Sequence, residues 1–132
     1  MSWVVDTSVL LDIYSADPQF AQASANCLAK FLPDRLLICP VSYIEMAPAF
    51  EGNRILQNQF LAEVGVEWPI PWTLTDTEAA HRLWNEHIAR KRSGTTAKRP
   101  VADVLIEAFA QRFQGIITRN PAHFSMVKVV VP

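Results

Sequence analysis

The chain contains short, nearly continuous apolar runs separated by longer segments with helical periodicity. Runs of this kind are typical of strands that are covered on both faces of a parallel sheet. A run over 66–70 is weaker, because Pro69 limits it to a sheet edge or a turn. The four stronger runs cover residues 3–5, 36–39, 115–118 and 127–131. The pattern predicts a mostly parallel sheet buried between helices.

Two of the helical segments have start signals in the sequence. Asp17 is placed to act as the N-cap of a helix over 20–32. Thr75 and Glu78 have the spacing of a capping box, which predicts a helix over 75–92. On the apolar face of this second helix, the indole of Trp84 is expected to lie in the core.

A further helix is predicted over 101–113, with Pro100 at its start and Gly115 as its terminator. A helix carrying Glu45 is also expected after the second strand. Strands that alternate with helices and close on a C-terminal strand indicate an α/β domain. We expect one such domain over 1–132.

Composition narrows the class of protein. Half of the 132 residues are apolar and 19% are charged, which is typical of a globular domain and unlike a disordered chain. Cys27 and Cys39 form no metal-binding pattern, so we expect buried thiols in a reducing compartment. Asp6 and Asp12 interrupt the apolar start of the chain, which is unlike a signal peptide. These features predict a cytoplasmic protein without a membrane segment.

The formal net charge is −1, so binding to nucleic acid requires a local basic patch. One predicted loop, over 90–99, carries five of the twelve Lys and Arg residues. Its ordinary alternative is a solvated surface loop. The basic residues are Arg90, Lys91, Arg92, Lys98 and Arg99.

Polar side chains follow strands or open helices at four positions. Asp6 directly follows the first strand, Glu45 lies on the next predicted helix, Asp103 lies in a first helical turn, and Asn120 follows the third strong run. Sites in parallel sheets form beyond the carboxyl ends of the strands. Each position has a structural alternative: an N-cap for Asp6, an exposed helix residue for Glu45, a solvated stripe shared with Glu107 for Asp103, and a turn for Asn120.

If the three carboxylates lie close together in the folded chain, a bound proton or cation must offset their electrostatic repulsion. Two like charges about 4 Å apart repel by roughly 4 kcal/mol at an effective dielectric constant near 20. Oxygen ligands favour Mg²⁺ or Mn²⁺ over zinc, and Mg²⁺ usually takes one or two carboxylates together with water and phosphate oxygens. Sequence spacing does not establish that the three side chains meet.

Four stretches carry a family resemblance: VVDTSVLLD, CPVSYIEM, RPVADVLIEAFA and IITRN, in this order. They resemble the PIN domain, and most closely the VapC-like ribonuclease toxins of bacterial toxin–antitoxin pairs. The resemblance spans essentially the whole chain. It implies a three-layer α/β/α sandwich with a central, mostly parallel sheet, and an acidic pocket that binds Mg²⁺ or Mn²⁺ for cleavage of RNA. It also implies a homodimer that a small antitoxin protein neutralises.

The resemblance also implies roles for particular residues. Ser8 matches a hydroxyl residue that supports the first acid, and Thr118 matches the hydroxyl two places before the fourth acid. Thr7 is a third candidate for orienting the carboxylates. The metal-binding and catalytic acids of the family fall on Asp6, Glu45 and Asp103.

The fourth acidic position departs from the family pattern, because Asn120 stands where Asp is common. An amide oxygen can still bind Mg²⁺ or orient a water, but one negative charge is lost. Glu107, one helical turn after Asp103, is a candidate to supply a compensating carboxylate. The working hypothesis is metal-assisted hydrolysis of RNA phosphodiester bonds. Arg119 and the basic segment over 90–99 would contact the RNA backbone.

Three other functions are alternatives to the ribonuclease hypothesis. Asn120 favours a PIN-like module that has lost catalysis and binds RNA or a protein. A receiver-type phospho-acceptor needs an aspartate at the end of a middle strand, where this chain has Cys39 and Pro40. A haloacid-dehalogenase-type phosphatase needs a second aspartate at the position of Ser8.

Overall fold

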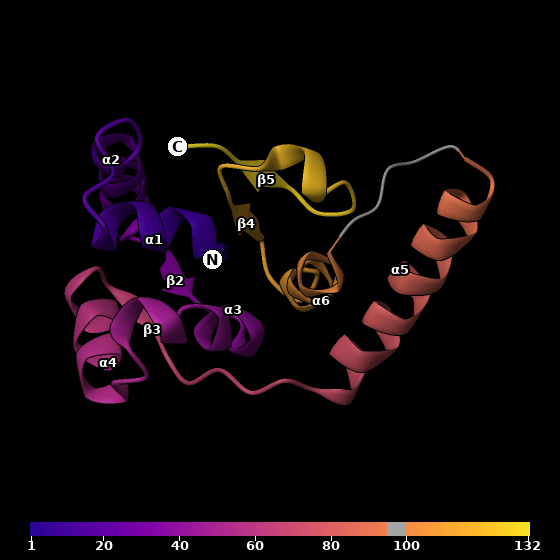
Figure 1. The fold of residues 1–132 in the computed structure, drawn as a ribbon, viewed down its shortest axis with the longest axis horizontal. Helices are drawn as coiled ribbons and strands as arrows, with labels where there is room; N and C mark the ends of the chain where they lie inside the picture. The colour runs from indigo at the N-terminus through magenta and orange to yellow at the C-terminus, as the bar shows by residue number, and fades with distance from the viewer. Residues whose placement is uncertain (95–99) are drawn as a thin grey trace.

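The computed structural model describes residues 1–94 and 100–132. In these residues, five strands form one sheet in the order β3-β2-β1-β4-β5, and all neighbouring strands are parallel (Figure 1). The five apolar runs predicted as strands all contribute, and the weak run over 66–70 supplies only a short edge strand. The strands are β1 (Ser2–Val5), β2 (Arg35–Leu37), β3 (Val66–Glu67), β4 (Gly115–Ile117) and β5 (Val129–Val130).

The central strand β1 is buried on both faces. Trp3 and Val5 join the larger apolar core on one face, whereas Val4 joins the core on the other face. Val4 lies between Leu37 of β2 and Ile116 of β4 in the parallel register. Burial on both faces explains why the strand sequences are continuously apolar.

Helices cover both faces of the sheet, so that the molecule has three layers (Figure 1). Apolar residues of α1, α2 and α4 pack on one face, and those of α6 pack on the other. Helix α5 packs on α6, and α3 contacts both α1 and α6. The helices are α1 (Thr7–Tyr14), α2 (Ala21–Phe31), α3 (Pro40–Glu45), α4 (Arg54–Glu63), α5 (Leu74–Arg92) and α6 (Val101–Ala110), with 3₁₀ turns η1 (Ala47–Phe50) and η2 (Pro121–His123).

The capping box of α5 lies two residues before the predicted one. Thr73 is the N-cap and Asp76 closes the box, so the prediction of Thr75 and Glu78 was wrong. Asp76 is completely buried and forms a two-point ion pair with Arg112, at 2.6 and 2.9 Å. The charge of Arg112, which is far from Asp76 in the sequence, stabilises this carboxylate at the start of the helix. The spacing of residues along the chain could not predict this pair.

Three smaller predictions also need correction. Helix α2 begins at Ala21, because the Asp17 carboxylate accepts backbone N–H groups of the preceding turn. Gly115 does not terminate α6 but opens β4, where a Cβ atom would overlap the carbonyl oxygen of Lys128. Trp84 is 37% exposed and therefore lies outside the core.

The cysteines and the helix lengths bear on two further predictions. Within the described residues both cysteines are free thiols, and Cys39 is buried as expected while Cys27 is only half-buried. None of the helices described is both long enough and apolar enough to cross a membrane.

Candidate active site

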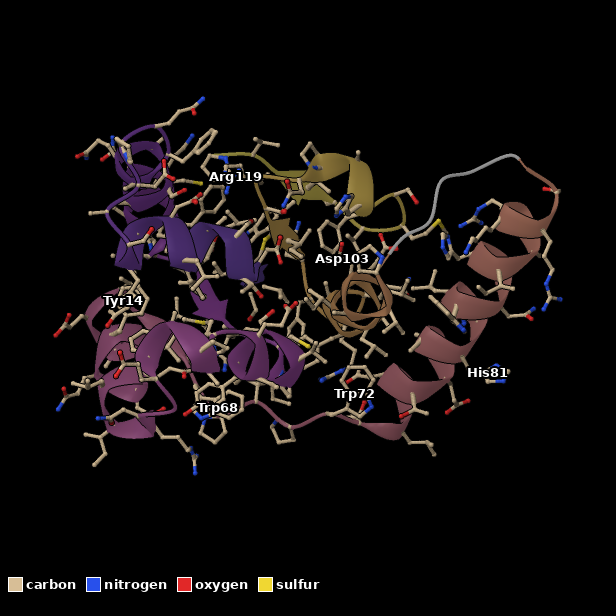
Figure 2. The ribbon with its side chains drawn as sticks, in the orientation of Figure 1. Tyr14, Trp68, Trp72, His81, Asp103 and Arg119 are labelled. Carbon is tan, nitrogen blue, oxygen red and sulfur yellow. The ribbon has the colours of Figure 1, made fainter. Side chains whose placement is uncertain are left out.

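Several of the predicted site residues lie at or close to the carboxyl ends of the strands. Asp6 directly follows β1 and is the N-cap of α1, so its structural and functional alternatives coincide. Thr118 and Asn120 follow β4, while Glu45 is the last residue of α3. Asp103 lies in the first turn of α6, which packs beside these strand ends (Figure 2).

Asp6 is buried and accepts three hydrogen bonds. Its Oδ1 atom accepts from the backbone N–H of Thr7 at 2.8 Å. Its Oδ2 atom accepts from Thr118 Oγ1 at 2.7 Å and from Ser8 Oγ at 3.2 Å. Thr118 Oγ1 in turn accepts from the backbone N–H of Asn120 at 3.0 Å. These bonds hold the carboxylate in one orientation.

Thr7 connects the first two acids. Its hydroxyl donates to Glu45 Oε1 at 2.7 Å, and its backbone N–H donates to Asp6. The helix start at Thr7 therefore orients one carboxylate from its own segment and another from α3. The three hydroxyl residues predicted to support the acids all contact a carboxylate.

The carboxylates lie close enough to perturb one another. Burial raises the pKa of Asp6, and the charge of Asp103 raises it further, while the hydrogen bonds lower it. Burial also raises the pKa of Glu45, with additional contributions from the charges of Asp6 and Asp103. The three acids thus share one electrostatic environment, as the hypothesis of a common site requires.

His123 is a member of this neighbourhood that the sequence analysis missed. Its Nδ1 atom lies 2.6 Å from Asp103 Oδ2. His123 closes η2, the turn that follows β4, so it reaches the acids from the same strand end as Asn120. Its position shortly after IITRN was the available signal.

Two predicted site residues are engaged elsewhere. Glu107 is completely buried, so the solvated stripe considered for α6 was wrong; its Oε2 atom accepts from the backbone N–H of Met126 at 2.9 Å. Arg119 forms a two-point ion pair with Asp12, at 2.6 and 2.9 Å, and its guanidinium lies 4.1 Å from the ring centre of Phe20. Glu107 therefore anchors the segment before β5, and Arg119 connects the end of β4 to α1.

The remaining candidates are exposed or lie outside the described residues. Asn120 is exposed, and only its backbone N–H is described in contact with the site, through Thr118 Oγ1. Arg90, Lys91 and Arg92 are exposed in the last turn of α5. The other two basic residues of the predicted loop, Lys98 and Arg99, lie outside the described residues.

The donor set fits a hard divalent cation. Among the residues that the structure describes, no group of three or more His, Cys, Asp or Glu side chains could hold a metal ion as it stands. Mg²⁺ does not need such a group, because it usually keeps several waters and takes one or two protein carboxylates. Asp6 and Glu45 offer carboxylate oxygens already oriented by hydroxyls, and a cation would relieve their mutual repulsion with Asp103.

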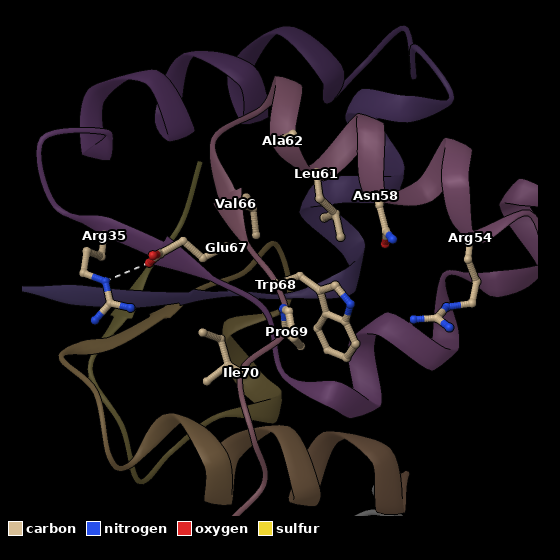
Figure 3. Close-up of a pocket in the computed structure, with 10 residues that line it drawn as sticks. All are labelled: Arg35, Arg54, Asn58, Leu61, Ala62, Val66, Glu67, Trp68, Pro69 and Ile70. Atoms are coloured by element: carbon tan, nitrogen blue, oxygen red, sulfur yellow. Dashed lines mark hydrogen bonds and ion pairs between the residues drawn. The ribbon is translucent and has the colours of Figure 1, made fainter.

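A cavity of about 630 Å³ lies at the other side of α3, along the sheet edge formed by β3 (Figure 3). Trp68 lines it and stacks on Tyr43 with ring centres 3.8 Å apart. Arg54 and Asn58 point into the same region (Figure 3). None of the predicted acids lines this cavity.

Comparisons with known proteins identify the fold. The sequence matches no family model, and no curated protein matches it. The structure is similar to a chain in the crystal structure of VapBC2 from Rickettsia felis bound to a DNA fragment from their promoter, with a TM-score of 0.70 and 16% sequence identity. The match covers 100% of this chain and 99% of that chain. Together with the all-parallel sheet between helical layers, this likeness shows that the chain has a PIN-like α/β/α fold.

Proposed function

We propose that the protein is a divalent-metal-dependent endoribonuclease and the toxin of a toxin–antitoxin pair. The observation that supports this most directly is that the pKa values of Asp6 and Glu45 are raised by burial and, in addition, by the charge of Asp103. Because like charges are costly in a partly buried site, such an arrangement is expected where a cation binds. The VapC-like fold agrees with this proposal.

The residues of the chain have distinct tasks in this proposal. Asp6, Glu45 and Asp103 would hold Mg²⁺ or Mn²⁺ through carboxylate oxygens. When bound, the ion supplies a Lewis acid for a phosphate oxygen and lowers the pKa of a bound water. Thr7 and Thr118 keep two of the carboxylates oriented, so that little rearrangement is needed when the substrate binds.

RNA is the proposed substrate, and its backbone would contact the basic residues near the end of α5. Contacts to phosphate position a nucleic acid without reading its sequence. Because the net charge of the chain is −1, such contacts must come from a local group of basic residues. The described members, Arg90, Lys91 and Arg92, have exposed side chains at the end of α5. We include Lys98 and Arg99 in the proposal on sequence grounds.

A small antitoxin and a second copy of the chain are the proposed protein partners. The antitoxin is supported by the likeness to VapBC2 and by the family resemblance, whereas the second copy rests on the family resemblance alone. A short neighbouring gene for a DNA-binding protein would support the antitoxin. Sedimentation of the purified chain would test the homodimer.

Loss of the acids tests the catalytic proposal. Asp6→Asn and Asp103→Asn should each abolish cleavage of a labelled RNA while the circular dichroism spectrum stays unchanged. Glu78→Gln, an exposed site on α5, is the matched control and should retain activity. Retained cleavage in either acid variant would end the nuclease assignment.

Removal of metal gives a second test. Cleavage by the purified protein should stop in EDTA and return when Mg²⁺ or Mn²⁺ is added in excess. Cleavage that EDTA does not affect would show that the acids act without a metal, or that the activity comes from a contaminant.

A binding module is the second candidate function. Asn120 favours it, because the neutral amide removes one of the charges that the family uses. A catalytically inactive module should show no specific Mn²⁺ binding by titration calorimetry, yet should still bind RNA or a protein. Specific Mn²⁺ binding together with cleavage would exclude it.

A further inference from the structure

His123 and Asp103 form the closest side-chain contact described at the acids. The Nδ1 atom of the ring lies 2.6 Å from Asp103 Oδ2, within ion-pair distance. The Asp103 side chain is only 17% exposed, whereas that of His123 is 44% exposed. The contact joins α6 to the turn after β4, two elements that are separated in the chain.

The start of α6 does not allow Asp103 to form a capping box. Asp103 is the third residue of the helix, and an acid at this position commonly accepts from the backbone N–H of the N-cap residue. Asp76 makes this bond at the start of α5, where Thr73 is the N-cap. The N-cap of α6 is Pro100, which has no N–H group, so Asp103 cannot close a capping box.

We propose that His123 is a positioning residue, which holds the Asp103 carboxylate toward Asp6 and Glu45 so that a divalent ion can bind. This inference rests on the function proposed above. A carboxylate has two oxygens that can accept or ligate, so the His123 contact at Oδ2 is compatible with metal binding. Hydrogen bonds to ligating groups are worth 10–100-fold in metal affinity in comparable sites.

The test compares three substitutions at His123 by Mn²⁺ titration calorimetry. His123→Leu removes the donor and should weaken Mn²⁺ binding by about 10–100-fold. His123→Asn places an amide N–H where Nδ1 stands and should restore most of the affinity. His123→Gln places its amide one bond farther out and should restore less. His81→Leu is the control, because His81 projects from the outer side of α5 (Figure 2).

The outcomes separate this inference from the proposed function. If His123→Leu and the wild type bind Mn²⁺ equally while the wild type cleaves RNA, the positioning role of His123 is refuted and the nuclease remains. If the wild type itself binds no Mn²⁺, both proposals fail. Because the side chain of His123 is nearly half exposed, the variants should fold, and circular dichroism checks this. If His123→Leu does not fold, equal affinities for His123→Asn and His123→Gln refute the role.

Discussion

Thr118 stabilises the ionised form of Asp6, and its replacement by valine tests the electrostatics of the site. The buried hydroxyl donates to Asp6 Oδ2 at 2.7 Å and accepts from the backbone N–H of Asn120 at 3.0 Å. Valine has nearly the same shape but neither donor nor acceptor. Thr118→Val therefore leaves the Asp6 carboxylate with one donor fewer.

The size and the pH dependence of the effect follow from these two bonds. A hydrogen bond to a charged group contributes about 1.5–3 kcal/mol and a neutral one about 0.5–1.5 kcal/mol, so the free energy of unfolding should fall by about 2–4 kcal/mol at pH 7.5. Burial raises the pKa of Asp6 and the Thr118 hydroxyl lowers it, so the ionised form is the one that needs the hydroxyl. Because the pKa of Asp6 is raised, a larger share of Asp6 is protonated in the folded protein at pH 4 than at pH 7.5, so the destabilisation should be smaller at pH 4.

Urea unfolding at pH 7.5 and pH 4, followed by circular dichroism, measures both quantities. Thr118→Ser keeps the hydroxyl and should recover much of the loss. Thr75→Val, at an exposed threonine of α5, is the control for the chemical change itself. An equal loss of stability at the two pH values would show that the hydroxyl does not act through the charge of Asp6.

Three further predictions concern stability and reactivity. Burial raises the pKa of Asp6, so ionisation of this group lowers the free energy of unfolding as the pH rises through that pKa. Asp6→Asn removes this contribution, so the melting temperature of the variant should fall less, relative to the wild type, between pH 4 and 7. An unchanged pH dependence of the melting temperature would contradict this. Arg112→Leu leaves the buried Asp76 carboxylate uncompensated and should cost about 3–5 kcal/mol in urea unfolding, whereas a loss below about 1 kcal/mol would show that the pair is not structural. Burial raises the pKa of the Cys39 thiol to about 12, so at pH 8 a thiol reagent should modify Cys27 first, and faster reaction of Cys39 would count against the buried site.

Much of the fold could be predicted because its signals are local. A strand buried on both faces needs a continuous apolar run, so Trp3 to Val5 indicate β1 without reference to any distant residue. The position of Asp6 at a strand end could be predicted for the same reason, because Asp6 directly follows this apolar run. The helix starts were less predictable, because Asp17 and Asp76 each have backbone or ion-pair partners that change which residue opens the helix.

The acids of the candidate site were partly predictable for a topological reason. Parallel strands bring their carboxyl ends to one edge, so residues that follow β1 and β4 must lie near each other. That rule accounts for Asp6 and Thr118, which are hydrogen-bonded although they are 112 residues apart. It says nothing about which way a helical side chain points, and so the burial of Glu107 could not be anticipated.

The parallel α/β architecture and the candidate acids could be inferred from the sequence, because strand burial and strand-end position depend on short segments of the chain. The partners of those side chains, in contrast, depend on how distant segments pack together. Arg119 pairs with Asp12 and His123 contacts Asp103, contacts that depend on how α1 and α6 pack around the end of β4. Which side chains pair depends on their distances in the folded protein, and these distances cannot be read from their separation along the sequence.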